Sequence, residues 1–440
     1  MAVAAMTATT LVRALGRRDI IGILLNAMIG SGMLAAPAKV YAIAGGWSFM
    51  VLFASALLLV PLILCFADLG SRFSGTGGPY LYARSALPPQ AAFSVGWLLW
   101  FSQAMSAATL CNLMVSYLAG FVPAVADGWP RVAVILGLGV VLTGIALVGI
   151  KESARVSNVL IVIKVGFVAV FLIAGIAFID PGNLKATTDL PAAPQFATAM
   201  LIYLFAYSGF ERGAVIAGEA REPRRDVPIA LAASVVIATL AYGAVLLVCV
   251  GILDAPAATD RPLAEAGRQI FGGPGALAVS AGALVVIVGT VLIIVVTMPR
   301  MLLALAEQDQ LPAFLSKIHP RWRTPHVAIL ISSALCFGLA IVSDLITALT
   351  IATATRVVAY ILCCIALARL SPRPEAPQPQ FRLPFAGPVA LVTAALFTVV
   401  LVIGARKELL PLIVVTAVGL VILLVHTQNQ RARAKAVAQP

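Results

Sequence analysis

Five charged side chains lie inside long apolar runs of this sequence, where an unpaired charge is costly. They are Lys39, Lys164, Glu211, Arg212 and Arg356. Charged groups at membrane depth face the protein interior, pair with one another and mark ion or substrate pathways. A desolvated lysine ammonium can exchange a proton. Lys164, Glu211 and Arg356 are therefore candidates for proton coupling or gating, and static ion pairs or snorkelling to the membrane surface are the structural alternatives. Lys39 is interpreted as a vestibule or snorkelling residue.

Two further positions combine glycine and serine in the middle of an apolar run. The first is Gly30-Ser31-Gly32, and the second is Ser208-Gly209, shortly before Glu211. Glycine weakens a helix by about 1 kcal/mol relative to alanine, so we expect both runs to be interrupted there. An interrupted helix exposes amides that attract a carboxylate and carbonyls that attract an ammonium. Two such breaks side by side would clamp an α-amino acid; close packing through small residues is the alternative.

Membrane helices must position these residues. Of the 440 residues, 61% are hydrophobic and 11% are charged, whereas an ordinary soluble domain has about 25% charged residues. A soluble enzyme, a nucleic-acid-binding protein and a disordered chain are poor interpretations of this composition. Twelve apolar runs can span a bilayer, at about 20–43, 46–69, 90–122, 131–149, 156–179, 196–217, 228–252, 276–306, 326–342, 345–370, 386–405 and 409–427.

The basic residues between these runs indicate an orientation. With the N-terminus in the cytoplasm, 20 Lys and Arg residues fall on the cytoplasmic side and 6 on the opposite side, in agreement with the positive-inside rule. An even number of spans then places both termini in the cytoplasm. This bias explains the net charge of +12 without a nucleic-acid partner. The alanine-rich composition suggests a bacterial inner (plasma) membrane.

The two breaks fall in spans 1 and 6, which are corresponding positions of two five-helix halves. Because five is odd, the second half is inverted relative to the first, and paired broken helices in inverted repeats indicate a transporter site. We expect a cytoplasmic N-terminal segment, two repeats, two additional helices and a cytoplasmic tail, at 1–19, 20–179, 196–370, 386–427 and 428–440.

Five motifs in the expected order resemble the amino acid–polyamine–organocation superfamily of transporters, over essentially the whole chain. They lie at 30–32 (GSG), 75–82 (GTGGPYLY), 218–228 (GEAREPRRDVP), 311–312 (LP) and 319–325 (HPRWRTP). The resemblance implies an all-α polytopic membrane protein with twelve transmembrane helices. These would form a 5+5 inverted repeat with broken helices 1 and 6, plus two extra helices. It also implies transport of amino acids or related amines by alternating access.

The resemblance further implies which residues bind the substrate. Amides of the first break would bind its carboxylate, and carbonyls of both breaks would bind its amine. Phe205 also falls where many relatives place an aromatic gate. The substrate-binding residues implied in this way are Met28, Gly30, Ser31, Gly32, Phe205, Ser208 and Gly209.

Lys164 resembles a helix 5 lysine that some relatives place against the broken part of helix 1, where its ammonium replaces a sodium ion. It would couple transport to protons, or act as a structural substitute for sodium in an exchanger or exporter. Glu211 and Arg356 would gate the site or sense protons, or form a static ion pair. Helix 8 carries Thr290 and Thr297 but no adjacent hydroxyl pair, which favours sodium independence.

The leading hypothesis is a proton-coupled, sodium-independent secondary transporter of amino acids. Neutral substrates are favoured, because no acid besides Glu211 is placed to hold a second ammonium. An enzyme is disfavoured because the three histidines lie in loops or at helix ends, and a primary pump lacks its nucleotide-binding motif. We expect no cofactor and no metal, with the six cysteines as core residues. The particular substrate, the direction of transport and the oligomeric state are left open.

Overall fold

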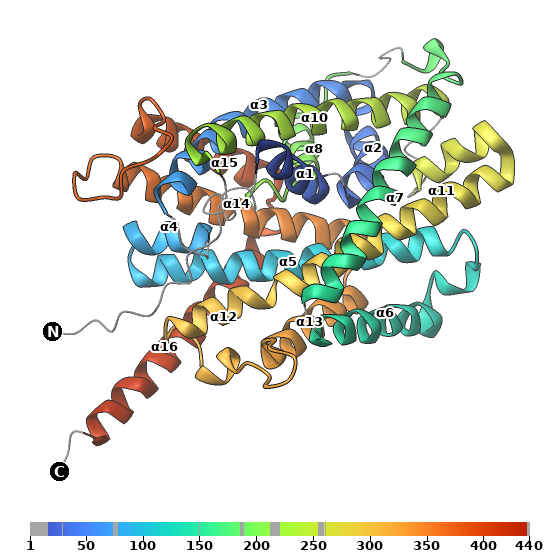
Figure 1. Ribbon diagram of the computed structural model, residues 1–440. Coiled ribbons are helices and arrows are strands. Elements are labelled where there is room, and N and C mark those ends of the chain that lie inside the picture. The colour runs from blue at the N-terminus through green and yellow to red at the C-terminus, as the bar shows by residue number, and fades with distance from the viewer. Residues whose placement is uncertain are drawn as a thin grey trace.

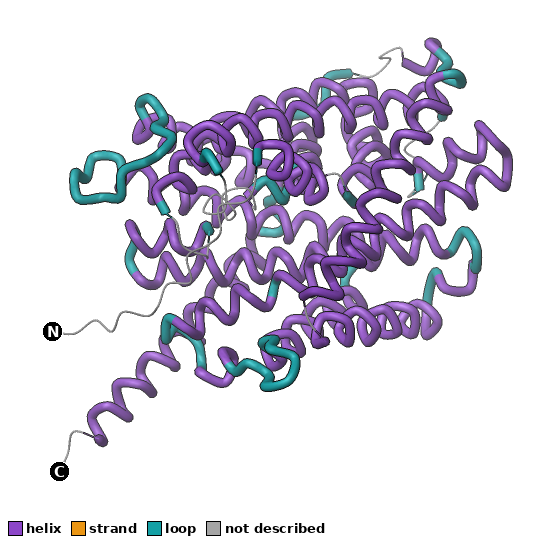
Figure 2. Tube along the Cα trace, viewed as in Figure 1, coloured by secondary structure: helices purple, strands orange, loops and turns teal. Residues whose placement is uncertain are grey.

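The computed structural model describes residues 16–28, 30–73, 78–148, 150–184, 189–211, 221–253, 259 and 261–437. Within these ranges every regular element is a helix, and the helices form one elongated bundle (Figures 1 and 2). This agrees with the expected all-α class.

The α-helices differ widely in length. They are α1 (Arg17–Met28), α2 (Ser31–Ala44), α3 (Ser48–Arg72), α4 (Pro79–Ala86), α5 (Pro89–Leu118), α6 (Gly128–Val148), α7 (Ile150–Ile176), α8 (Ala193–Ala206), α10 (Pro223–Ile252), α11 (Pro262–Thr297), α12 (Pro299–Glu307), α13 (His326–Val342), α14 (Leu345–Leu370), α15 (Ala386–Gly404) and α16 (Leu409–Val437). Short 3-10 helices are η1 (Gly45–Trp47), η2 (Pro123–Val125), η3 (Pro181–Leu184) and η6 (Ala313–Ser316).

Eight helical segments in the described part of the chain are long and apolar enough to cross a membrane. Large apolar side chains cover the outside of the bundle; Leu57, Val140 and Ile173 are each about three-quarters exposed. Such a surface requires lipid instead of water as its solvent. The eight segments are Gly32–Arg72, Pro89–Leu118, Gly128–Val148, Arg225–Ile252, Pro262–Glu307, Leu345–Leu370, Ala386–Gly404 and Leu409–Ala432, and three shorter apolar helices are Ile163–Ile176, Ala193–Ala206 and His326–Val342.

Helices α7, α11 and α16 are among those that extend beyond the expected spans. Helix α7 begins at Ile150, and α16 continues to Val437. The added residues are rich in Lys, Glu, Ala, Arg and Gln, which are good helix formers and continue the helix past its apolar part. Helix α11 begins at Pro262, but Gly272 has φ 70° and ψ −157°, so its first part meets the span at a kink. The early start of α7 places Lys164 in the middle of that helix and away from its end.

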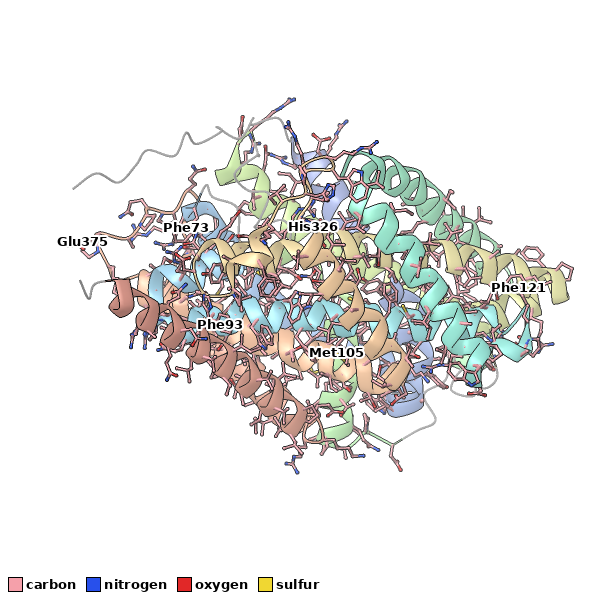
Figure 3. All side chains as sticks on the ribbon, turned by 90° about the horizontal axis from the view of Figure 1, so that it is seen from below. Phe73, Phe93, Met105, Phe121, His326 and Glu375 are labelled. Carbon is pink, nitrogen blue, oxygen red and sulfur yellow. The ribbon has the colours of Figure 1, made fainter. Side chains whose placement is uncertain are left out.

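Helix α5 runs through the centre of the bundle and packs against α11, α13 and α14. Most of its side chains are buried, and the Ser102 hydroxyl donates to the carbonyl of Ala352 on α14 at 2.7 Å. Figure 3 shows Met105 of α5 in the interior, with Phe121 and Glu375 near opposite ends of the molecule. The residues that line the centre therefore come from α5 and from the helices around it.

Candidate substrate site at two helix breaks

The first span is interrupted between α1 and α2. Gly30 has φ −146° and ψ −140°, so the backbone there is extended, and Ser31 begins the second half-helix. The first amides of a helix have no partner within that helix. The N-cap residue of α2 is Gly30, which has no side chain that could cap these amides. The amides of Ser31 and Gly32 are therefore candidates to bind an anion.

The second break follows α8, which ends at Ala206. A turn occupies 207–210 and helical structure resumes at Glu211. Gly209 has φ 113°, a conformation that glycine adopts without strain. The Ser208 amide donates to the carbonyl of Phe205 at 3.1 Å, and the Gly209 amide donates to the Glu211 carboxylate at 2.8 Å. The Phe205 side chain is buried, whereas Ser208 is half-buried and faces accessible space.

The two breaks pack crosswise against each other. A β-carbon added at Gly32 would lie 2.3 Å from the Cα atom of Ala206, and one added at Gly209 would lie 2.8 Å from the Cβ atom of Ala27. Each break therefore contacts the helix end that precedes the other break. Glycine is required at both positions because no side chain fits between the backbones. The arrangement brings the available amides of α2 close to the carbonyls at the end of α8.

Tyr242 of α10 connects the ends of both preceding half-helices. Its hydroxyl oxygen lies 2.7 Å from the carbonyl oxygen of Met28 and 2.8 Å from that of Ala206. The residue is 3% exposed, so water cannot replace these contacts. Tyr242 is not among the site residues predicted from the sequence. The available signal was a tyrosine inside an apolar run, since a buried phenol usually finds a hydrogen-bond partner.

Lys164 lies against the first break. Its Nζ atom would be 3.9 Å from a β-carbon added at Gly30, and the Thr290 hydroxyl would be 3.6 Å from the same point. Lys164 is 4% exposed, and Thr290 also donates to the carbonyl of Val286 at 2.8 Å. Helices α7 and α11 therefore place an ammonium and a hydroxyl beside the extended backbone at Gly30. This arrangement puts a positive charge where α1 and α2 separate.

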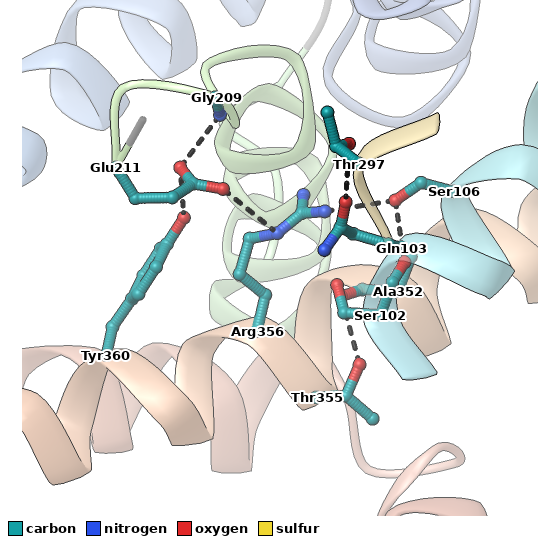
Figure 4. Close-up of polar contacts among 10 residues, drawn as sticks. All are labelled: Ser102, Gln103, Ser106, Gly209, Glu211, Thr297, Ala352, Thr355, Arg356 and Tyr360. Carbon is teal, nitrogen blue, oxygen red and sulfur yellow. Dashed lines mark hydrogen bonds and ion pairs between the residues drawn. The ribbon is translucent and has the colours of Figure 1, made fainter. Parts of the chain in front are cut away.

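Glu211 and Arg356 are brought together at the second break (Figure 4). Glu211 Oε1 lies 3.9 Å from Arg356 Nε, and its Oε2 accepts from the Tyr360 hydroxyl at 3.0 Å. Arg356 Nη2 donates to the Ser106 hydroxyl of α5 at 3.0 Å. This network joins the break after α8 to α14 and α5. Tyr360 was not singled out from the sequence, although it follows Arg356 by about one helical turn on the same face.

The wall opposite Arg356 is polar. The Thr297 hydroxyl of α11 lies 3.5 Å from the Gln103 carboxamide oxygen of α5, and both residues are half-buried. These hydroxyl and amide groups can form hydrogen bonds with a small polar ligand. Among all residues that the structure describes, no group of three His, Cys, Asp or Glu side chains could hold a metal ion. The six cysteines are free and buried.

Some predicted features lie outside the described residues. These are Arg212, the side chain of Ser31, and parts of two sequence motifs at 75–77 and 218–220. Lys39 is half-buried on α2, roughly two turns after the break. The structure therefore places Met28, Gly30, Gly32, Lys164 and Thr290 around the first break. Around the second it places Phe205, Ser208, Gly209, Glu211 and Arg356.

Comparisons with known proteins agree with this architecture. Residues 15–423 match the sequence pattern of a family described as "Amino acid permease". The chain is 26% identical to the methylthioribose transporter of Bacillus subtilis, over 88% of this chain and 87% of the relative. It is 25% identical to the branched-chain amino acid permease BcaP of the same organism, over 96% and 94% of the two chains. It is also 26% identical to the serine/threonine exchanger SteT of B. subtilis, over 73% and 75%.

Proposed function

This chain belongs to the amino acid permease family, and on that premise we propose that it is a secondary active transporter that moves amino acids by alternating access. It is an integral membrane protein, as its eight apolar helical segments and its transporter relatives indicate.

In the proposed orientation the arginine-rich connections and both termini face the cytoplasm, and the bilayer is a bacterial inner membrane. The names of these relatives give methylthioribose, branched-chain amino acids, or serine and threonine as their substrates. Family membership alone therefore leaves the substrate of this chain undefined.

One observation carries the proposal: the two helix breaks lie side by side. The uncapped amides at Ser31 and Gly32 attract a carboxylate, helped by the positive end of the α2 dipole. The Met28 carbonyl at the end of α1 accepts from the Tyr242 hydroxyl, and the Phe205 carbonyl accepts from the Ser208 amide at the second break. In this proposal the remaining lone pairs of these two carbonyls, together with the Ser208 carbonyl, attract the ammonium. The carboxylate and ammonium of an α-amino acid are attached to one carbon atom. Two adjacent breaks can therefore bind both groups at once.

Lys164 provides the proposed coupling. Its ammonium lies beside the extended backbone at Gly30, where a bound cation would neutralise exposed carbonyls. Transfer of its proton would remove that charge and weaken the link between α7 and the first break. In a proton-coupled transporter this loss changes the equilibrium between outward-facing and inward-facing states. In an exchanger, the ammonium would stay charged and replace a sodium ion.

The contacts of Glu211 with Gly209, Arg356 and Tyr360 form the proposed gate. They tie the second break to α14, so movement of Glu211 away from α14 requires that the Tyr360 and Arg356 contacts separate. Because Arg356 balances the charge of Glu211, this carboxylate is not free to hold a second ammonium on the substrate. This charge balance favours neutral substrates over cationic amino acids and polyamines.

Transport by purified protein in liposomes tests the function. Uptake of a panel of labelled amino acids is measured with an inward proton gradient, with a sodium gradient, and with unlabelled amino acid trapped inside. We expect proton-driven, sodium-independent accumulation of neutral amino acids. Uptake that appears only with trapped amino acid would identify an exchanger. Absence of uptake of every amino acid and amine would overturn the proposal.

The role of Lys164 is tested with a matched pair of variants. Lys164→Ala removes the ammonium at the break, whereas Lys407→Ala removes an exposed lysine from the connection between α15 and α16. We expect Lys164→Ala to abolish proton-driven accumulation and Lys407→Ala to retain it. If the Lys164→Ala protein still accumulates substrate with the proton gradient, the coupling site lies elsewhere.

A further inference from the structure

Two donor nitrogens of Arg356 are buried without a hydrogen-bond partner among the residues that the structure describes. The residue is 5% exposed, and its guanidinium carries five N–H groups. Nη2 donates to the Ser106 hydroxyl at 3.0 Å. Nε and Nη1 are buried and have no hydrogen-bond partner among the described residues. Buried donors on a charged group are seldom left in this state, because their lost hydration is not replaced.

The ion pair with Glu211 does not satisfy these donors. The Nε–Oε1 separation of 3.9 Å is longer than a hydrogen bond. Contacts at the other oxygen orient the carboxylate: Glu211 Oε2 accepts from the Gly209 amide at 2.8 Å and from the Tyr360 hydroxyl at 3.0 Å. The charge of Arg356 is therefore balanced, while its hydrogen-bonding capacity is not filled.

Accessible polar surface adjoins this guanidinium. Most residues in this region are buried, but four polar residues remain half-buried: Gln103, Ser208, Glu211 and Thr297. Figure 4 shows the guanidinium between Glu211 on one side and Gln103 and Ser106 on the other. Glu211 contacts both the backbone of the second break and Arg356, so the guanidinium is only one side chain away from that break. A ligand clamped at the breaks can direct its side chain toward Arg356.

We propose that Arg356 determines substrate specificity by donating a hydrogen bond to a side-chain oxygen of a neutral polar amino acid. The inference rests on the proposed transport function. A cationic side chain would be repelled, and an aliphatic one would leave the buried donors without a partner. A carboxylate would compete with Glu211 and add an unbalanced negative charge. A hydroxyl or amide oxygen fills a donor and keeps the charge balance, which selects serine, threonine, asparagine and glutamine.

Threonine and valine provide a matched pair of substrates, because they have the same shape and differ by a hydroxyl in place of a methyl group. In liposomes containing the wild-type protein, we expect the specificity ratio (kcat/KM) of threonine over valine to be about tenfold or more, the size of one hydrogen bond to a charged group. In Arg356→Leu we expect this ratio to fall to about one or below. The control Arg406→Leu, which replaces an exposed arginine outside the site, should keep the wild-type ratio.

A second variant covers the case in which Arg356→Leu leaves Glu211 unpaired and the protein does not fold. The double variant Arg356→Leu with Glu211→Gln removes both charges, and ligand-induced thermal stabilisation then measures threonine and valine binding without transport. Equal stabilisation by the two ligands in the double variant and a threonine preference in the wild type support the inference. Wild-type protein that transports valine as well as threonine overturns it while the transport function stands. If the wild-type protein transports no amino acid at all, both this inference and the proposed transport function are overturned.

Discussion

The hydroxyl oxygen of Tyr242 lies 2.7 Å from the carbonyl oxygen of Met28, the last residue before the first helix break. The same oxygen lies 2.8 Å from the carbonyl of Ala206, which ends the helix before the second break. One side chain of α10 therefore holds together two half-helices that are far apart in the sequence.

Tyr242→Phe should destabilise the protein and slow transport. It removes one hydroxyl and leaves two buried carbonyls without this partner, at an expected cost of about 1–3 kcal/mol in the free energy of unfolding. Thermal unfolding in detergent and uptake in liposomes measure the two effects. Tyr203→Phe is the control, because the buried Tyr203 hydroxyl has no hydrogen-bond partner in the described structure. Equal stability of the two variants would contradict the role of Tyr242.

Gly32→Ala should prevent the close packing of the two breaks. The added β-carbon would lie 2.3 Å from the Cα atom of Ala206, and backbone atoms cannot move aside as a flexible side chain can. We expect a large loss of folded protein, measured by size-exclusion chromatography and thermal unfolding. Gly166→Ala in α7 is the comparison, because nothing lies within 4 Å of its added β-carbon. That variant should be neutral or more stable by up to about 1 kcal/mol.

Glu211→Gln should cost more stability than removal of the whole ion pair. It leaves the Arg356 guanidinium buried without a counter-charge, and breaking one partner of a buried pair typically costs about 3–5 kcal/mol. The double variant Glu211→Gln with Arg356→Gln should regain part of this loss. A double-mutant cycle on thermal stability measures the coupling between the two side chains. A coupling near zero would show that the 3.9 Å contact has no energetic weight.

We expect the stability of the protein to depend on pH through Asp344, the N-cap residue of α14. Partial burial raises the pKa of the Asp344 carboxyl, whereas hydrogen bonds from the Thr347 hydroxyl and from the amides of Thr347 and Ile346 lower it. The hydrogen bonds have the larger combined effect, so the pKa is below its ordinary value. Because the folded-state pKa is the lower one, this cap stabilises the protein above the unfolded pKa, about 3.9. The stabilisation is lost as the pH falls through the folded-state pKa.

Asp344→Ala tests this dependence. At pH 7 the variant should be less stable than the wild type by about 1 kcal/mol, the usual value of an N-cap. The difference should shrink as the pH falls below about 4, because the wild-type carboxyl then becomes protonated. Thermal unfolding of both proteins across this range measures it. Asp344→Asn keeps a capping oxygen but has no charge, so the difference in stability between Asp344→Asn and Asp344→Ala should change little with pH. A constant stability difference between Asp344→Ala and the wild type at all pH values would refute the assignment.

The sequence by itself determined the class of protein, the family and most of the helices. Runs of about 20 apolar residues require a bilayer whatever their neighbours are, so hydropathy locates the spans. The family prediction is confirmed by the match over residues 15–423. The positions of both interruptions were also readable, because the low helix propensity of Gly30 and Gly209 is a local property. Helix ends were less predictable where helix-forming polar residues continue a span, as in α7 and α16.

Only the tertiary structure decided which of these residues meet. Nothing local to Tyr242 indicates that it contacts Met28 and Ala206, and nothing local to Gly32 names Ala206 as its neighbour. The pairing of Arg356 with Glu211 likewise depends on how α14 packs against α5 and the second break. So do the two Arg356 nitrogens that have no hydrogen-bond partner in the described part of the chain. Helix propensity and hydropathy act within one segment, whereas hydrogen bonds and close packing join segments through the three-dimensional arrangement of the whole bundle.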